Sequence, residues 1–173
     1  MRKGSIMAKN IYFQCRKDLD LTREEACDLL ETISTDRLER IENGRVTPTP
    51  SDVKELAKGY KAHHLMNYYC THQCEIGKDY VPEVKIKDLS QIVLETINLL
   101  NHLEARKNKF IEISVDGKIT EDEIRDFVEI KIELERISMT IDSLKLWTQK
   151  MLSNGSIDED VYKRIESELK ASM

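Results

Sequence analysis

The chain has few of the residues that make tight turns: its 173 residues include only 6 glycines and 3 prolines. A sandwich or barrel of many short strands needs frequent turns, so this scarcity argues against both architectures. Helices need fewer such residues. We therefore predict an all-α chain.

Long apolar runs and cysteine clusters are also missing. No stretch approaches the roughly 20 apolar residues of a membrane-spanning helix, and the first residues lack the apolar segment of a secretory signal. Four cysteines are too few for a disulfide scaffold, which fits a reducing compartment. We expect a cytoplasmic protein without a membrane partner.

The distribution of charge and proline divides the chain in two. Residues 1–78 contain 13 basic and 12 acidic residues (net +1), whereas residues 79–173 contain 14 and 20 (net −6). Pro82 lies in a polar stretch, with short apolar segments before it and long periodic ones after it. The predicted organisation is a flexible leader at 1–9, a domain of short helices at 10–78, a linker at 79–87 and a helical module at 88–173.

Helix-start and helix-stop signals recur in the first half. Thr22 and Glu25 have the spacing of a capping box, and Ser34 can cap the next helix. Gly44 can adopt the left-handed conformation that ends a helix. Thr49, Pro50 and Asp52 supply the cap, first-position proline and third-position carboxylate of a fourth helix. Five short helices are therefore predicted, at about 10–19, 22–31, 35–43, 50–60 and 63–74.

The order of these segments resembles a known family. LTREEACDLL, followed by IST, RLERIENG and PTPSDVKELAKGY, is similar to the XRE-like helix-turn-helix domain of phage repressors and many bacterial regulators. The resemblance covers about residues 10–74, and RIENG at 40–44 is its strongest element. It implies a lambda-repressor-like fold, double-stranded DNA as partner, and a structural ion pair between Arg16 and Glu42.

Two features depart from the family pattern. The segment from Thr22 to Gly44 is one residue longer than the consensus, and Glu31 and Thr32 replace the usual turn glycine. The net charge of +1 also offers little general attraction, because non-specific affinity for DNA comes from phosphates neutralised by Lys and Arg. An interaction adaptor that keeps the fold without binding DNA is therefore the rival hypothesis.

Docking of the family type would place the third predicted helix in the major groove. Arg37 is the best base reader there, since a guanidinium can donate two hydrogen bonds to guanine. The alternative for this face is a solvated surface stabilised by spaced ion pairs. The resemblance implies base contacts by Thr35, Asp36, Arg37 and Arg40, and phosphate contacts by Thr22, Arg23, Asn43 and Arg45.

The second half predicts an antiparallel helical hairpin with coiled-coil spacing and a short third helix at 159–170. Apolar residues repeat in heptads over about 121–153, and a second stripe, Ile132, Met139 and Leu146, lies on the opposite side of the same helix. A helix that is apolar on two sides must be covered twice. We expect a homodimer through this stripe; the alternative is cover by the third helix and the linker within one chain.

No motif indicates an enzyme or a cofactor, because nothing resembles a glycine-rich phosphate loop, a nucleophile elbow or a carboxylate pair in a cleft. Cys70 and Cys74 could form a redox or metal sensor, although buried packing is the commoner role of cysteine. The leading prediction is a sequence-specific transcriptional regulator that acts as a homodimeric repressor on a palindromic operator. Its effector could be an unknown protein or a small molecule. When bound to DNA, it would be associated with the nucleoid.

Overall fold

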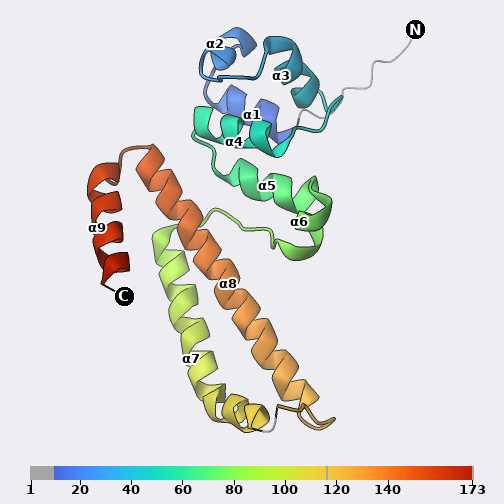
Figure 1. Cartoon of the computed structure of the whole chain (residues 1–173), viewed down its shortest axis with the longest axis vertical. Helices are drawn as coiled ribbons and strands as arrows, with labels where there is room; N and C mark the ends of the chain where they lie inside the picture. Colours follow the sequence, from blue (N-terminus) through green and yellow to red (C-terminus); the bar gives the residue numbers. More distant parts are fainter. Residues whose placement is uncertain (1–9, 116, 173) are drawn as a thin grey trace. The chain divides into compact units, whose positions relative to one another are not determined.

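The computed structural model describes residues 10–115 and 117–172 (Figure 1). Within these residues the chain forms α-helices and no strand, which confirms the predicted all-α class. The leader predicted at residues 1–9 lies outside the described residues. The helices are α1 (Ile11–Asp18), α2 (Arg23–Asp28), α3 (Thr35–Glu42), α4 (Pro50–Gly59), α5 (His64–His72), α6 (Glu75–Tyr80), α7 (Leu89–Ser114), α8 (Ile124–Ser153) and α9 (Glu159–Ala171).

The chain divides into two compact units. One comprises the residues up to Glu83 and from Gln149 onward, and the other comprises Val84–Thr148. The long helix α8 therefore contributes to both units. The linker assigned to 79–87 and the module assigned to 88–173 stay predictions from the sequence.

The predicted helix caps of α2, α3 and α4 are confirmed. Thr22 and Thr49 each form a capping box with the residue three positions on, and the Ser34 side chain accepts a hydrogen bond from the Arg37 backbone. Gly44 follows α3 with φ +66°. Glycine adopts this left-handed conformation with little steric energy, because it has no Cβ atom. These caps determine where the chain reverses and so place α2 and α3 as a helix-turn-helix.

The apolar sides of α1 to α5 form one core. Tyr12, Leu38, Leu56 and Leu65 have no exposed surface, and they come from α1, α3, α4 and α5. Burial of each such side chain contributes roughly 1.5–3 kcal/mol relative to exposure. The core also contains Cys15, Ala26, Leu30, Ile33, Ile41, Val53, Ala57, Tyr60 and Ala62.

A sixth short helix, α6, follows the five that were predicted. Its N-cap is Cys74, whose Sγ accepts a hydrogen bond from the Gly77 backbone at 3.4 Å. Cysteine is not among the residues preferred at N-caps, so no helix start was predicted at this position. Gly77 is buried against the backbone of Cys70, so α6 packs on α5 through a position that has no side chain.

The substitution Gly77→Ala should displace α6 from α5. A Cβ atom at Gly77 would lie 2.2 Å from the Cys70 carbonyl oxygen, and a helix backbone cannot move aside without repacking. We expect a loss of about 1–3 kcal/mol of stability and faster amide exchange in residues 75–80. Lys78→Ala, an exposed change on the same helix, is the control and should stay within about 0.5 kcal/mol. Equal behaviour of the two variants would contradict this packing.

Within the second unit, α7 and α8 form the predicted antiparallel hairpin (Figure 1). Ion pairs join Arg106 to Glu129 and Lys109 to Asp126. Residue numbers therefore increase along α7 in the direction in which they decrease along α8, so the two helices are antiparallel. The line of α8 buried against α7 includes Ile130 but also three polar residues. These are Glu133, Thr140 and Ser143.

The buried line of α8 therefore differs from the heptad stripe expected from the sequence. Leu134, Ile141 and Leu144 belong to that stripe, but each remains more than 40% exposed. In the observed rotation of α8, Glu133 lies inward and pairs with Arg106 at 3.4 Å, while one carboxylate oxygen of Glu133 has no hydrogen-bond partner among the described residues. The hairpin consequently exposes apolar side chains that a stripe facing α7 would have buried.

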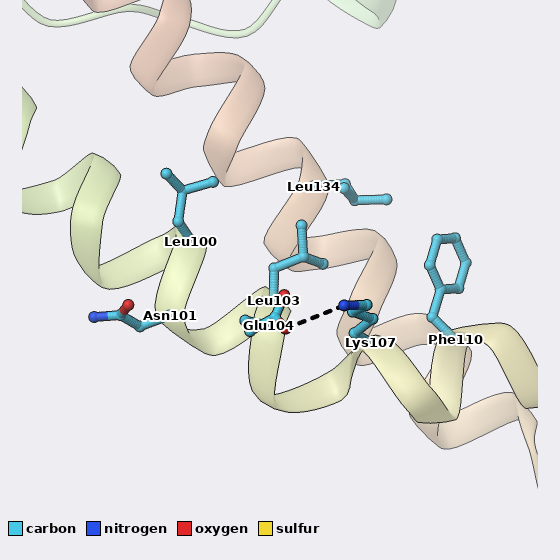
Figure 2. A pocket seen from close by; sticks show the side chains of 7 residues that line it. All are labelled: Leu100, Asn101, Leu103, Glu104, Lys107, Phe110 and Leu134. Carbon is cyan, nitrogen blue, oxygen red and sulfur yellow. Dashed lines mark hydrogen bonds and ion pairs between the residues drawn. The ribbon is translucent and has the colours of Figure 1, made fainter.

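One side of the hairpin carries an apolar groove, shown in Figure 2. Leu134 of α8 faces the side chains of α7 across it, and an ion pair between Lys107 and Glu104 at 3.2 Å lies at its polar edge. The groove is lined by Leu100, Asn101, Leu103, Glu104, Lys107, Phe110 and Leu134.

The last helix, α9, begins after a turn whose signals were predicted. Gly155 has φ +76°, and the Asp158 side chain accepts a hydrogen bond from the Val161 backbone as the N-cap. None of its residues is buried. In the part of the chain that the structure describes, no helix combines the length and the apolar character needed to cross a membrane.

Candidate nucleic-acid interface

The turn between α2 and α3 is held by a carboxylate from α4. The Thr32 backbone N–H and hydroxyl donate to Glu55 at 2.6 and 2.5 Å, and the Ile33 N–H donates at 3.4 Å. Burial acts to raise the Glu55 pKa, but the hydrogen bonds from Thr32 and Ile33 outweigh it, so the pKa is lowered. Helix α2 ends at Asp28 and not at Glu31 as the sequence predicted, because the Leu29 and Leu30 N–H groups donate three residues back, to Ala26 and Cys27.

Helix α3 has one apolar side and one polar side. Leu38 and Ile41 are fully buried and hold the helix from behind. On the opposite side Asp36 and Arg40 are exposed, with side-chain exposures of 81% and 54%, and a 4.0 Å ion pair joins them. Thr35 at the start of the helix is half-buried. The first turn of α3 thus presents polar side chains outward, as base reading requires.

Arg37, the predicted guanine reader, forms a bidentate ion pair with Asp52 at the start of α4. Its Nε and Nη2 donate to the two carboxylate oxygens at 2.9 and 2.5 Å. The hydrogen bond from Arg37 is the largest cause lowering the Asp52 pKa from 3.8 to about 2, with Thr49 contributing. The carboxylate would be protonated only as the pH falls toward 2, so the pair stays charged at neutral pH.

Glu42 accepts hydrogen bonds from two arginines. Arg16 donates from Nε and Nη2 at 2.5 and 2.8 Å, and Arg23 donates from Nε at 2.8 Å. The side chains of Arg16 and Glu42 are 4% and 0% exposed, whereas that of Arg23 is 30% exposed. Arg16 also donates to the Leu21 carbonyl at 2.6 Å. The cluster ties α1, α2 and α3 together, and it includes one residue, Arg23, that was predicted to contact phosphate.

The other predicted phosphate contacts lie at the ends of α2 and α3. Thr22 caps α2, with its hydroxyl accepting from the Glu25 backbone at 3.2 Å. Asn43 is the C-cap of α3, and its Nδ2 donates to Glu39 at 3.3 Å. Arg45 follows Gly44 and is exposed. Among the described residues, none forms an ion pair or hydrogen bond with the Arg45 side chain.

The cations of this surface are largely balanced by acids of the same domain. Arg23 is paired with Glu42 and Arg37 with Asp52, while Arg40 lies 4.0 Å from Asp36. A paired guanidinium keeps its unused N–H donors but presents little net charge. The surface is therefore suited to directional hydrogen bonding more than to general attraction of phosphates.

The cysteines have packing and capping contacts. Cys74 caps α6 through Gly77, and the Cys15 Sγ lies 3.6 Å from His64 Nε2. Burial raises the pKa of the Cys15 thiol to about 11, which keeps it protonated and unreactive. Cys70 is half-buried. Within residues 10–115 and 117–172, no group of three or more His, Cys, Asp or Glu side chains is placed to hold a metal ion.

Two residues of this surface, Asp52 and Glu55, were not among the predicted site residues. Asp52 was expected only as part of a local capping box, and the sequence holds no signal that links it to Arg37. Glu55 lies 23 residues from Thr32, and nothing in a helix-turn-helix pattern indicates that contact. Both contacts depend on how α4 packs beside the turn.

A comparison with known families finds one match, within the first half of the chain. Residues 14–66 match the family model described as a helix-turn-helix domain. The match begins in α1 and ends in α5, so it includes α2, the turn and α3. No curated protein and no solved structure matches the chain.

Proposed function

We propose that this chain is a sequence-specific DNA-binding transcriptional regulator of the XRE type, and that it acts as a homodimeric repressor on a palindromic operator. One observation carries the proposal: α3 of a matched helix-turn-helix domain turns a polar first turn outward while Leu38 and Ile41 anchor it from behind. Repression is favoured over activation, since a bound dimer blocks polymerase without a further contact surface.

The proposed complex places α3 in the major groove. Thr35, Asp36, Arg37 and Arg40 then face base edges, and Thr22, Arg23, Asn43 and Arg45 face the backbone. Arg23 can reach a phosphate while bound to Glu42, because its Nη donors are not used in that contact.

Selection from random or genomic DNA with the purified full chain tests the function, together with its mass in solution. We expect two half-sites about one or two helical turns apart and twice the chain mass. A duplex has pseudo-twofold symmetry at such a site, and a dimer matches it. Enrichment of no sequence, at low salt as well, would reject DNA recognition and support the adaptor hypothesis.

Arg45→Ala should weaken binding to all sequences alike. Arg45 is an exposed cation beside the end of α3, and loss of one phosphate contact should reduce the salt slope by about 0.9. Dissociation constants at several salt concentrations measure it. Lys163→Ala, which removes the same charge from exposed α9, is the matched control. An altered base preference or an unchanged slope would reject the phosphate contact.

The adaptor hypothesis keeps one observation in its favour, which is the pairing of Arg23, Arg37 and Arg40 with acids of the same domain. A surface with alternating charges can also bind a protein of complementary pattern. The two hypotheses differ in salt dependence, because a DNA complex releases counterions and loses affinity steeply as salt is added.

A further inference from the structure

Arg37 uses only part of its hydrogen-bonding capacity on Asp52. A guanidinium has five N–H donors. The Nε–H and one Nη2–H face the carboxylate, which leaves the second Nη2–H and both donors of Nη1. No other side chain among the described residues pairs with the Nη1–Nη2 end of the group, and the Arg37 side chain is 38% exposed.

Asp52 is itself fixed to the start of α4. Its Oδ2 accepts from the Thr49 backbone N–H at 2.6 Å and from the Thr49 hydroxyl at 2.8 Å, while its own N–H donates to that hydroxyl at 3.2 Å. The side chain of Asp52 is 8% exposed. Two hydrogen bonds from Thr49 hold this carboxylate in a buried cap independently of Arg37, so the arginine takes its orientation from the carboxylate.

We propose that Asp52 is a specificity-determining positioning residue, which holds Arg37 so that its Nη1–Nη2 end reads a guanine in the major groove. The inference rests on the proposed DNA-binding function. Guanine presents two adjacent acceptors, O6 and N7, that match two parallel N–H donors. Adenine presents one acceptor, N7, beside one donor, the N6 amino group, so it cannot accept both hydrogen bonds. An arginine ordered in advance loses less conformational freedom when it binds.

The ion pair with Asp52 also favours recognition of bases by Arg37 over non-specific attraction to phosphates. Asp52 balances the charge of Arg37, so the guanidinium gains little by turning to a phosphate. Removal of the carboxylate charge should then have two opposite effects. Preference for guanine falls because the orientation is lost, and affinity for unrelated DNA rises because an unpaired cation can reach the backbone. A contact that merely ties α3 to α4 would produce neither effect.

The test compares Asp52→Asn with wild type on the selected operator and on operators with each guanine replaced. Wild type should lose about tenfold or more in affinity at one guanine of each half-site, and the variant should lose less than about threefold there. The variant should also bind unrelated DNA more tightly and show a steeper salt slope by about 0.9. Glu31→Gln is the matched control, because it removes the same charge from an exposed carboxylate that pairs with Lys58 and not with Arg37.

The outcomes separate this inference from the function on which it rests. If wild type selects no sequence, the DNA-binding function itself fails. If it selects a site and Asp52→Asn keeps the full guanine preference, Asp52 has only a structural role. If Asp52→Asn does not fold, Arg37→Lys tests the proposal instead. Lysine keeps the positive charge but lacks the two parallel N–H donors, so this variant should lose the preference for guanine. Retained guanine preference in that variant would overturn the proposal.

Discussion

Replacement of Glu42 by alanine is expected to destabilise the helix-turn-helix domain by about 3–5 kcal/mol. The Glu42 side chain has no exposed surface and accepts two hydrogen bonds from Arg16, which is itself 4% exposed. Hydrogen bonding to Glu42 is the largest cause that raises the pKa of Arg16, so the arginine stays charged. Without the carboxylate, a charged guanidinium would remain in the core with the Leu21 carbonyl and the Phe13 ring, and neither carries a compensating charge.

Hydrogen exchange of amides in α1 to α3 during urea titration measures this loss, while the fluorescence of Trp147 reports on α8 as an internal reference. Glu24→Ala, an exposed change in α2, should stay within about 0.5 kcal/mol. The double variant Arg16→Met with Glu42→Leu should recover most of the stability, because no buried charge is then left unpaired. A loss below about 1 kcal/mol in Glu42→Ala would show that the cluster carries little of the stability.

The second large effect concerns the proposed dimer. The double variant Ile132→Lys with Met139→Lys should convert a dimer to a monomer and lower affinity for a two-half-site operator by about a hundredfold. Ile132 and Met139 are 45% and 36% exposed on one side of α8, and two charges there would have to be buried without partners. Affinity for a single half-site should not change, since each reading domain is intact.

Mass in solution and operator binding measure this result. The matched variant is Leu100→Lys with Leu134→Lys, which places the same two charges in the groove of Figure 2. If the groove variant becomes monomeric and the stripe variant stays dimeric, the copies meet at the groove and the predicted stripe is not the interface. If both variants keep twice the chain mass, neither apolar face joins two copies.

The caps and reversals of this chain were predictable from short-range patterns. Thr22 with Glu25, Ser34 and Thr49 with Asp52 each satisfy backbone N–H groups within three residues, so local sequence contains the whole interaction. Gly44 and Gly155 adopt positive φ for an equally local reason. The resemblance at residues 40–44 extended this information to the helix-turn-helix itself.

Interactions between distant residues were not predictable in the same way. Arg37 was expected to be a free base reader, and only the packing of α3 beside α4 brings it to Asp52. The contact of Glu55 with Thr32 likewise depends on the packing of α4 beside the turn. In the hairpin, heptad spacing indicated a helix pair, but not the rotation of α8 that buries Glu133 beside Arg106 of α7.

The sequence by itself therefore determined the helices, their caps and the order of the helix-turn-helix, because these depend on periodicity and on hydrogen bonds within one turn. Only the tertiary structure decided which charged side chains pair and which remain available. A long arginine can reach several carboxylates, and the packed backbone alone selects one of them. For this protein that selection places Asp52 behind Arg37, on the face proposed to read DNA.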